Sequence, residues 1–369
     1  MNTSWWPYVA LLLTLAACRN PSTELLDNPV ARERFARSAT LSLTGDNPAW
    51  LRERLIPPSG RGGGDLQPGD LATGWLEEWA DAHTAYGQVS LVREEAGPVD
   101  YRLWFSNFDG EKPVYLCLTL GQAPMPKGPR GHDSLVVLDW AEYPGALSAR
   151  GRWRSLEQLR SVLGPEALST TVIALVEASR AQEAGDPITA LQILEDLPEA
   201  AQAQALVVAE RLRMLAETGS DAFTDDLLSA GGILEAPAVA YLAFCWSLAA
   251  RDADGLRRST ADLARQFGPD SVLAFYAGLA AEWSGDCPAA QTHYDVVRTA
   301  LPNHPLVSWA GLNCDAATDP DFALDRLLSL LVGSELSLDE FDVWMAEAVP
   351  VLHRSRVYHD WRLSAPERL

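Results

Sequence analysis

Residues able to do acid–base or metal chemistry are scattered along this chain of 369 residues. It has six histidines, and none stands four residues from another, the spacing at which two side chains on one helix face hold the same metal ion. The motifs His-Glu-x-x-His, Cys-x-x-Cys and Gly-x-Ser-x-Gly do not occur in the sequence. The sequence therefore predicts no metal, no cofactor and no enzymatic activity.

One short segment, Gly131–Ser134, brings together a histidine, an aspartate and a serine, which are the residue types of a nucleophile and its base. Neighbouring residues on a strand point to opposite faces, so these side chains are poorly placed to share a site. One alternative stays open, an enzyme or small-ligand sensor with its site on residues 66–165. It predicts a polar pocket around Glu94, Asp109 or His132.

A cysteine near the start, Cys18, stands in a context that favours covalent modification. Residues 8–17 are largely apolar, and they are too few to cross a bilayer, which takes about 20 residues. They have the length of a signal-peptide core that ends in small residues. The ending Leu15-Ala16-Ala17-Cys18 resembles the lipobox of bacterial lipoproteins.

This resemblance to lipoproteins implies that residues 1–17 are a signal peptide and that the thiol of Cys18 carries lipid, palmitate included. One acyl chain alone holds a protein weakly, and several together make a stable anchor. Arg19 follows the cysteine, where an aspartate would mark retention in the inner membrane, so the outer membrane is favoured. We therefore expect a lipid-anchored protein of the cell envelope that faces the periplasm.

The composition narrows the class of partner. The formal net charge is −21, from 29 basic and 50 acidic residues. A chain this acidic is a poor ligand for nucleic-acid phosphates or anionic lipid surfaces, so we expect no nucleic-acid partner. Hydrophobic residues make up 47% of the chain, which is typical of a globular protein.

Residues 18–65 are expected to form a tether and a linker, and the folded elements begin after them. The glycine cluster in this linker is not followed by Gly-Lys-Ser/Thr, so it is not a phosphate-binding loop. Residues 66–165 predict a small antiparallel sheet with helices at Leu71–His83 and Trp153–Leu163. A hairpin turn is expected at Asp109–Lys112. The predicted strands are Gln88–Val92, Tyr101–Asn107, Val114–Leu120 and Leu135–Trp140.

A regular period marks the second half of the chain. Turn-like dipeptides begin at residues 185, 219, 251, 285 and 318, with spacings of 34, 32, 34 and 33 residues. The segments between them are rich in alanine and leucine and predict helices. The sequence therefore indicates a series of similar helix pairs.

The clearest unit, Phe275–Pro302, resembles the tetratricopeptide repeat (TPR). The resemblance implies that Gly278 permits close packing of helices, that Tyr294 fills the gap between them, and that Pro302 ends the second helix. It covers residues 169–333 and implies an α-solenoid. Residues 336–349 would cap that solenoid within a repeat domain of residues 169–350, followed by a tail, residues 351–369. A helical bundle with evenly spaced helix pairs remains the alternative.

The TPR resemblance also implies a concave partner-binding surface on the first helix of each pair. That surface would suit an amphipathic helix or an extended apolar segment. The alternative is that its side chains are buried by the N-terminal domain of the same chain. The inward positions are Tyr241, Cys245, Leu248, Val272, Phe275, Leu279, Glu282 and Trp283.

Four cysteines follow Cys18 in the sequence. The repeat arrangement implies that Cys287 and Cys314 lie close together, within reach of a disulfide. Cys117 and Cys245 are interpreted as small buried apolar residues.

Together, these patterns predict an α+β fold, in which a small antiparallel sheet with helices precedes a TPR-like solenoid. We expect a lipid-anchored scaffold that binds an unidentified envelope protein or peptide segment through its repeats.

Overall fold

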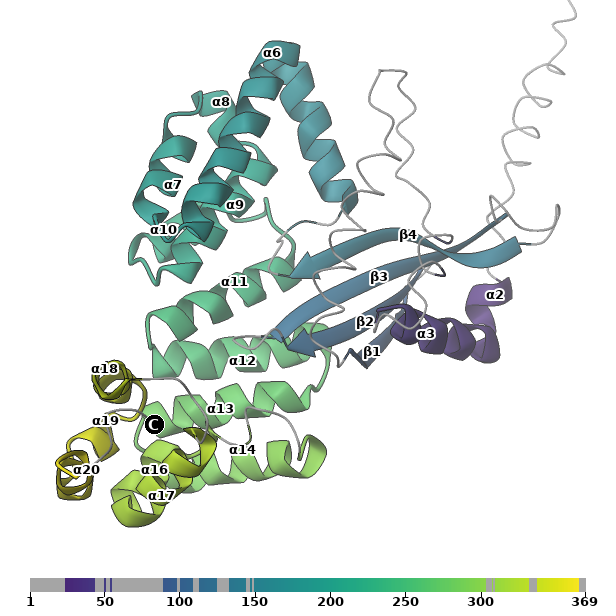
Figure 1. Ribbon diagram of the computed structural model, residues 1–369. Coiled ribbons are helices and arrows are strands. Elements are labelled where there is room, and N and C mark those ends of the chain that lie inside the picture. The colour runs from purple at the N-terminus through teal and green to yellow at the C-terminus, as the bar shows by residue number, and fades with distance from the viewer. Residues whose placement is uncertain are drawn as a thin grey trace, which may run out of the picture. The chain divides into compact units, whose positions relative to one another are not determined.

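The computed structural model divides into two compact units, Met1–Tyr143 with Leu147–Gln158, and Pro144–Ala146 with Leu159–Leu369 (Figure 1). The expected signal peptide with Cys18, the glycine-rich linker, the helix at Leu71–His83, Asp109 and His132 all lie outside the described residues. The structure describes residues 24–43, 50, 54, 89–97, 100–108, 113–124, 133–143, 147, 149–302, 307, 309–331 and 337–364.

The first unit contains a four-stranded antiparallel sheet in which sequence neighbours pair, in the order β1-β2-β3-β4. Phe108 pairs with Pro113 across the expected hairpin. All four predicted strands are confirmed, although the first runs on to Ala96 and the last two are longer than expected. The strands are β1 (Ser90–Ala96), β2 (Tyr101–Phe108), β3 (Pro113–Pro124) and β4 (Asp133–Tyr143).

Two helices at the start of the chain, α2 (Glu24–Asp27) and α3 (Pro29–Leu43), cover one face of this sheet. The strands contribute alternate residues to the shared core, because side chains on a strand point in turn to opposite faces. Figure 1 shows α3 beside β1 and β2. The core side chains are Phe35, Ala36, Ala39 and Leu43 from α3, and Tyr101, Leu103, Phe105, Leu116, Leu118, Leu120, Leu135 and Val137 from the sheet.

Residues 24–43 were expected to belong to a tether, and that prediction was wrong. Phe35, Ala39 and Leu43 recur at intervals of four residues and so lie on one face of α3, where they are buried. Arg32 adds a polar contact, since its guanidinium lies 4.5 Å from the centre of the Tyr101 ring. The interspersed charges hid this apolar face in the sequence.

A long helix, α6 (Ala149–Glu183), runs from the first unit into the second. It is broken at Gly164, whose φ of 81° and ψ of 172° are not helical, and Pro165 follows. The expected helix Trp153–Leu163 ends at this break. Among the described residues no single helix has the length and apolar character to cross a bilayer, and only the two halves of α6 taken together meet that criterion.

The second unit is built of short helices, several of which pack as consecutive pairs (Figure 1). They are α7 (Pro187–Glu195), α8 (Glu199–Gln202), α9 (Ala205–Glu217), α10 (Ala222–Ser229), α11 (Ala236–Ala249), α12 (Ala253–Phe267), α13 (Ser271–Trp283), α14 (Cys287–Ala300), α16 (Leu312–Thr318), α17 (Pro320–Leu331), α18 (Leu338–Ala348), α19 (Pro350–His353) and α20 (Arg356–Arg362).

The periodic turns fall where the sequence predicted them. Gly185, Gly219, Arg251 and Gly285 each join two helices and have φ values of 80°, 65°, 54° and 77°. A residue with positive φ ends a helix by turning the chain, and glycine adopts that conformation without a steric penalty. The fifth predicted turn separates α16 from α17 at Asp319.

A helix, α18, is present where the capping helix was expected, and it starts with a capping box between Ser337 and Glu340. The expected tail after residue 350 was in part wrong, because α19 and α20 follow. Leu352 and Tyr358 are buried against Phe341 of α18 in one apolar cluster. The ordered helices of this unit therefore continue to Arg362.

Candidate functional site

The aromatic stripe expected to form a partner surface lies largely inside the protein. Tyr241, Val272 and Phe275 are only 1%, 7% and 9% exposed. The Phe275 ring lies 5.3 Å from that of Tyr276 and 5.8 Å from that of Tyr294, centre to centre. These contacts fall within the helical unit, so these three side chains are core residues and the partner surface predicted there is wrong for them.

The other members of the stripe are less deeply placed. Leu248, Leu279 and Trp283 are half-buried. Cys245 is buried, as is Cys117 in the sheet, and this agrees with their interpretation as small apolar residues. The stripe therefore offers a partner only isolated edges of side chains.

Helices α13, α14 and α16 pack closely together at one junction. A Cβ atom added to Gly278 would lie 2.5 Å from the Tyr294 ring, so only glycine lets α13 approach α14 this closely. The Tyr294 hydroxyl donates to the carboxylate of Glu282, which also accepts the backbone N–H of Asn313 at 2.9 Å. Burial, and then the Glu282 charge and hydrogen bond, raise the pKa of Tyr294, so its hydroxyl stays protonated.

A disulfide reinforces the same junction. Cys287, the first residue of α14, is bonded to Cys314 of α16, and their Cα atoms are 5.5 Å apart. This pair is the one that the repeat arrangement placed together. The bond holds α14 and α16 covalently beside the Glu282 hydrogen bonds.

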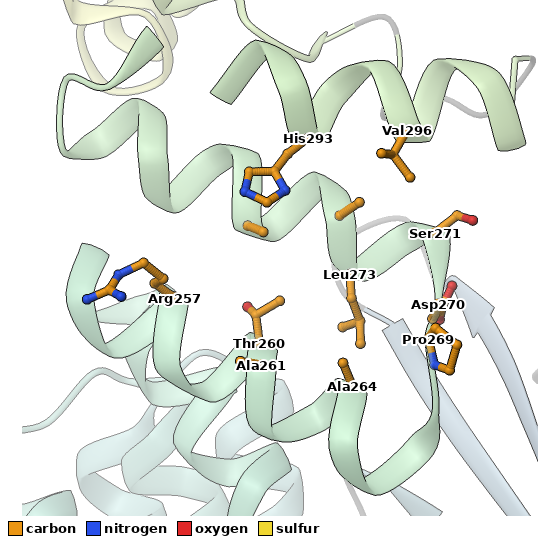
Figure 2. A pocket seen from close by; sticks show the side chains of 12 residues that line it. Arg257, Thr260, Ala261, Ala264, Pro269, Asp270, Ser271, Leu273, His293 and Val296 are labelled. Carbon is orange, nitrogen blue, oxygen red and sulfur yellow. The ribbon is translucent and has the colours of Figure 1, made fainter. Parts of the chain in front are cut away.

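The helical unit has an open pocket of about 440 Å³ formed by α12, α13 and α14, which we call the α13 groove (Figure 2). Its shape follows from small side chains on two helices, at a spacing of three residues, because three-residue steps keep them on one helix face. Leu273 and Val296 add larger apolar surface, and Val296 is 50% exposed. The small residues are Ala261 and Ala264 on α12, and Ala274 and Ala277 on α13.

The two ends of the α13 groove differ in charge. In Figure 2, Arg257 and His293 lie toward one end and Asp270 toward the other. Arg257 donates to Asp254 at 2.9 Å, and this pair is largely exposed. Asp270 caps α13 by accepting the backbone N–H of Val272. The groove is therefore an apolar trough with a basic end and an acidic end.

Thr260 lines the groove between Arg257 and Ala264 and is 5% exposed (Figure 2). In the part of the chain that the structure describes, its hydroxyl has no hydrogen-bond partner. A buried hydroxyl without a partner loses its hydration and gains nothing in return. This hydroxyl is therefore an unpaired buried polar group beside an apolar groove.

Replacing Thr260 with valine keeps the shape of the side chain and removes this hydroxyl. We expect the substitution to raise the free energy of unfolding by about 1 kcal/mol, since no hydrogen bond is lost and a desolvated polar group disappears. Urea denaturation followed by circular dichroism measures the change. Thr218→Val is the matched control, because the Thr218 hydroxyl donates to the carbonyls of Met214 and Leu215, and it should destabilise. A loss of stability in Thr260→Val would contradict the conclusion that the Thr260 hydroxyl is buried without a hydrogen-bond partner.

None of the residues proposed from the sequence as a partner site lines the α13 groove. The alanine pairs on α12 and α13 could have indicated it, but alanines in a helical array equally mark helix contacts. Of the residues named for an enzyme or sensor site, Glu94 is described, and it accepts a hydrogen bond from Tyr101. Burial and this carboxylate raise the pKa of Tyr101 to about 12.

Metal chemistry was not expected from the sequence. Within the described ranges, no three histidine, cysteine or acidic side chains cluster in a way that could hold a metal ion.

The fold and the groove define an α+β protein with a small sheet unit and a larger unit of packed helices. No protein-family model, no curated protein and no solved structure matches this chain.

Proposed function

We propose that this protein is a lipid-anchored scaffold of the cell envelope that docks another protein through TPR-like helix pairs. The observation that carries the proposal is the α13 groove, an open apolar trough on three firmly packed helices. Open grooves between helices are a common way to bind a peptide segment. The groove takes the place of the aromatic stripe as the docking surface.

The TPR-like organisation is supported by the packing of the clearest unit. Gly278 and Tyr294 are in the close contact that the repeat implies, and Ala290 is buried at 1% exposure. Residues with positive φ also recur at the periodic turns. These features favour a repeating array over a bundle whose helix pairs are evenly spaced by chance.

Export is supported by the chemistry of the cysteines. Disulfides persist in oxidising compartments and are rare in the reducing cytosol. The Cys287–Cys314 bond is therefore an observation in favour of the envelope that does not depend on the lipobox. Cys18 supplies the proposed anchor, and the acidic composition favours a protein partner over nucleic acid.

A photo-crosslinking residue at Val296 tests the proposal in intact cells, because this exposed side chain lines the groove. We expect an adduct with an envelope protein, and no adduct from the control position Val343, which is 66% exposed on α18. Fatty-acid labelling should be lost in Cys18→Ala. Equal labelling of both forms would refute the anchor, and the absence of adducts from every position on the helical unit would refute the scaffold.

A further inference from the structure

We infer that the α13 groove is selective for a polypeptide segment in which branched apolar side chains stand next to an acidic one. The inference rests on the proposed docking function and adds the chemistry of the partner. It is carried by the sizes of the side chains in the groove and by the charges at its two ends.

The apolar part of the groove fits aliphatic side chains. Four alanines line it, together with Leu273 and Val296. Branched aliphatic side chains gain from leaving water and fill a trough of this size without needing polar partners. Side chains larger than alanine at the groove positions would fill the space themselves. The groove therefore exists because these residues are small.

The basic end of the groove favours a carboxylate. His293 has no hydrogen-bond or ion-pair partner within the described part of the chain, and its ring is directed into the groove (Figure 2). The side chain of Arg257 is 69% exposed and that of Asp254 is 73% exposed. An exposed pair of this kind is weak, so Arg257 can turn to an incoming carboxylate at little cost. A guanidinium and an imidazole together can donate several hydrogen bonds.

The acidic end of the groove disfavours an acidic side chain of the bound segment. Asp270 lies there, and its carboxylate is held by the backbone N–H of Val272. A second carboxylate beside Asp270 would be repelled, whereas one beside Arg257 and His293 would be attracted. The whole protein carries a net charge of −21, so an acidic partner gains from few places on this surface. Charge complementarity therefore places the acidic side chain of the segment beside Arg257 and His293.

The first experiment measures binding of defined peptides to the purified full chain by fluorescence polarisation. The probe is an acetylated, amidated and fluorescein-labelled dodecapeptide with Leu-Val-Asp at its centre and neutral polar residues elsewhere. Its three relatives replace the aspartate with asparagine or lysine, or the Leu-Val pair with Ser-Ser. We expect the asparagine peptide to bind about five-fold more weakly than the parent, and the lysine and Ser-Ser peptides more weakly still.

Variants of the protein then locate the site. Ala277→Leu should abolish binding of the parent peptide, because the leucine side chain fills the groove, whereas Ala249→Leu, at an exposed alanine of α11 that does not line the groove, should leave it unchanged. In the double variant Arg257→Gln and His293→Gln the ratio between the aspartate and asparagine peptides should fall to about one. Circular dichroism melting of each variant shows that the fold is retained.

Three results would overturn the inference. They are the absence of binding by the parent peptide, equal affinity for the aspartate, asparagine and lysine peptides, and unchanged binding by Ala277→Leu. A preference for the lysine peptide would show a basic partner instead. The photo-crosslinking experiment separates this failure from that of the scaffold. An adduct that persists when Ala277→Leu is added would keep the docking function and exclude the groove as its site.

Discussion

Replacing both Cys287 and Cys314 with serine will lower the free energy of unfolding of the helical unit by about 3–4 kcal/mol. The bond joins residues separated by 27 positions, and closing a loop of this length removes much of the conformational freedom of the unfolded chain. In a unit of this size the melting temperature should fall by roughly 10 °C. Differential scanning calorimetry at neutral pH measures both quantities.

A reducing agent provides the matched control for this prediction. Dithiothreitol should lower the melting temperature of the wild-type protein to that of the double serine variant, and it should not change the variant. The sheet unit contains neither cysteine, so its own unfolding should be the same in all four samples. A wild-type protein that melts at the same temperature with and without reductant would contradict the predicted contribution.

The second large effect is expected at the contact between Gly278 and Tyr294. Tyr294 is 1% exposed, so Tyr294→Ala should cost about 3–5 kcal/mol by opening a cavity and by removing the hydrogen bond to Glu282. Gly278→Ala should cost about 1–3 kcal/mol in the wild type, since its Cβ would meet the Tyr294 ring.

The effect of Gly278→Ala on the free energy of unfolding should change sign when the Tyr294 ring is absent. In the Tyr294→Ala background the new methyl group has space, and alanine is favoured over glycine inside a helix by about 1 kcal/mol. A double-mutant cycle in guanidinium chloride measures the difference. In the Tyr294→Phe background, which keeps the ring, Gly278→Ala should still destabilise. If Gly278→Ala lowers the free energy of unfolding equally in all three backgrounds, its contact with the Tyr294 ring does not determine how closely α13 approaches α14.

The parts of the fold that the sequence predicted are those set by short-range patterns. Tyr101, Leu103 and Phe105 recur at every second position, and this period of two identifies a strand before any partner is known. The helix turns were predictable because a glycine followed by an aspartate both ends one helix and caps the next, as at Gly185 and Asp186. The pairing of Cys287 with Cys314 followed from the repeat arrangement.

The features that the sequence did not predict depend on the tertiary neighbours of each helix or strand. The apolar face of α3 has only Phe35 and Leu43 as large residues, with Ala39 between them, and arginines intervene. Whether Phe275 faces a partner or the core depends on the position of the Tyr294 ring, which periodicity does not give. The α13 groove is lined by alanines of two different helices. The sequence alone does not show that these alanines lie side by side.

The break in α6 has a practical consequence for dissecting this protein. Gly164 and Pro165 interrupt the helix close to the boundary between the two units, and helix hydrogen bonding is already lost there. Dividing the gene at this point would therefore leave the α3–sheet core in one polypeptide and the disulfide, the Gly278 contact and the groove in the other. Each half could then be labelled separately for nuclear magnetic resonance, with spectra simple enough to follow peptide titrations residue by residue.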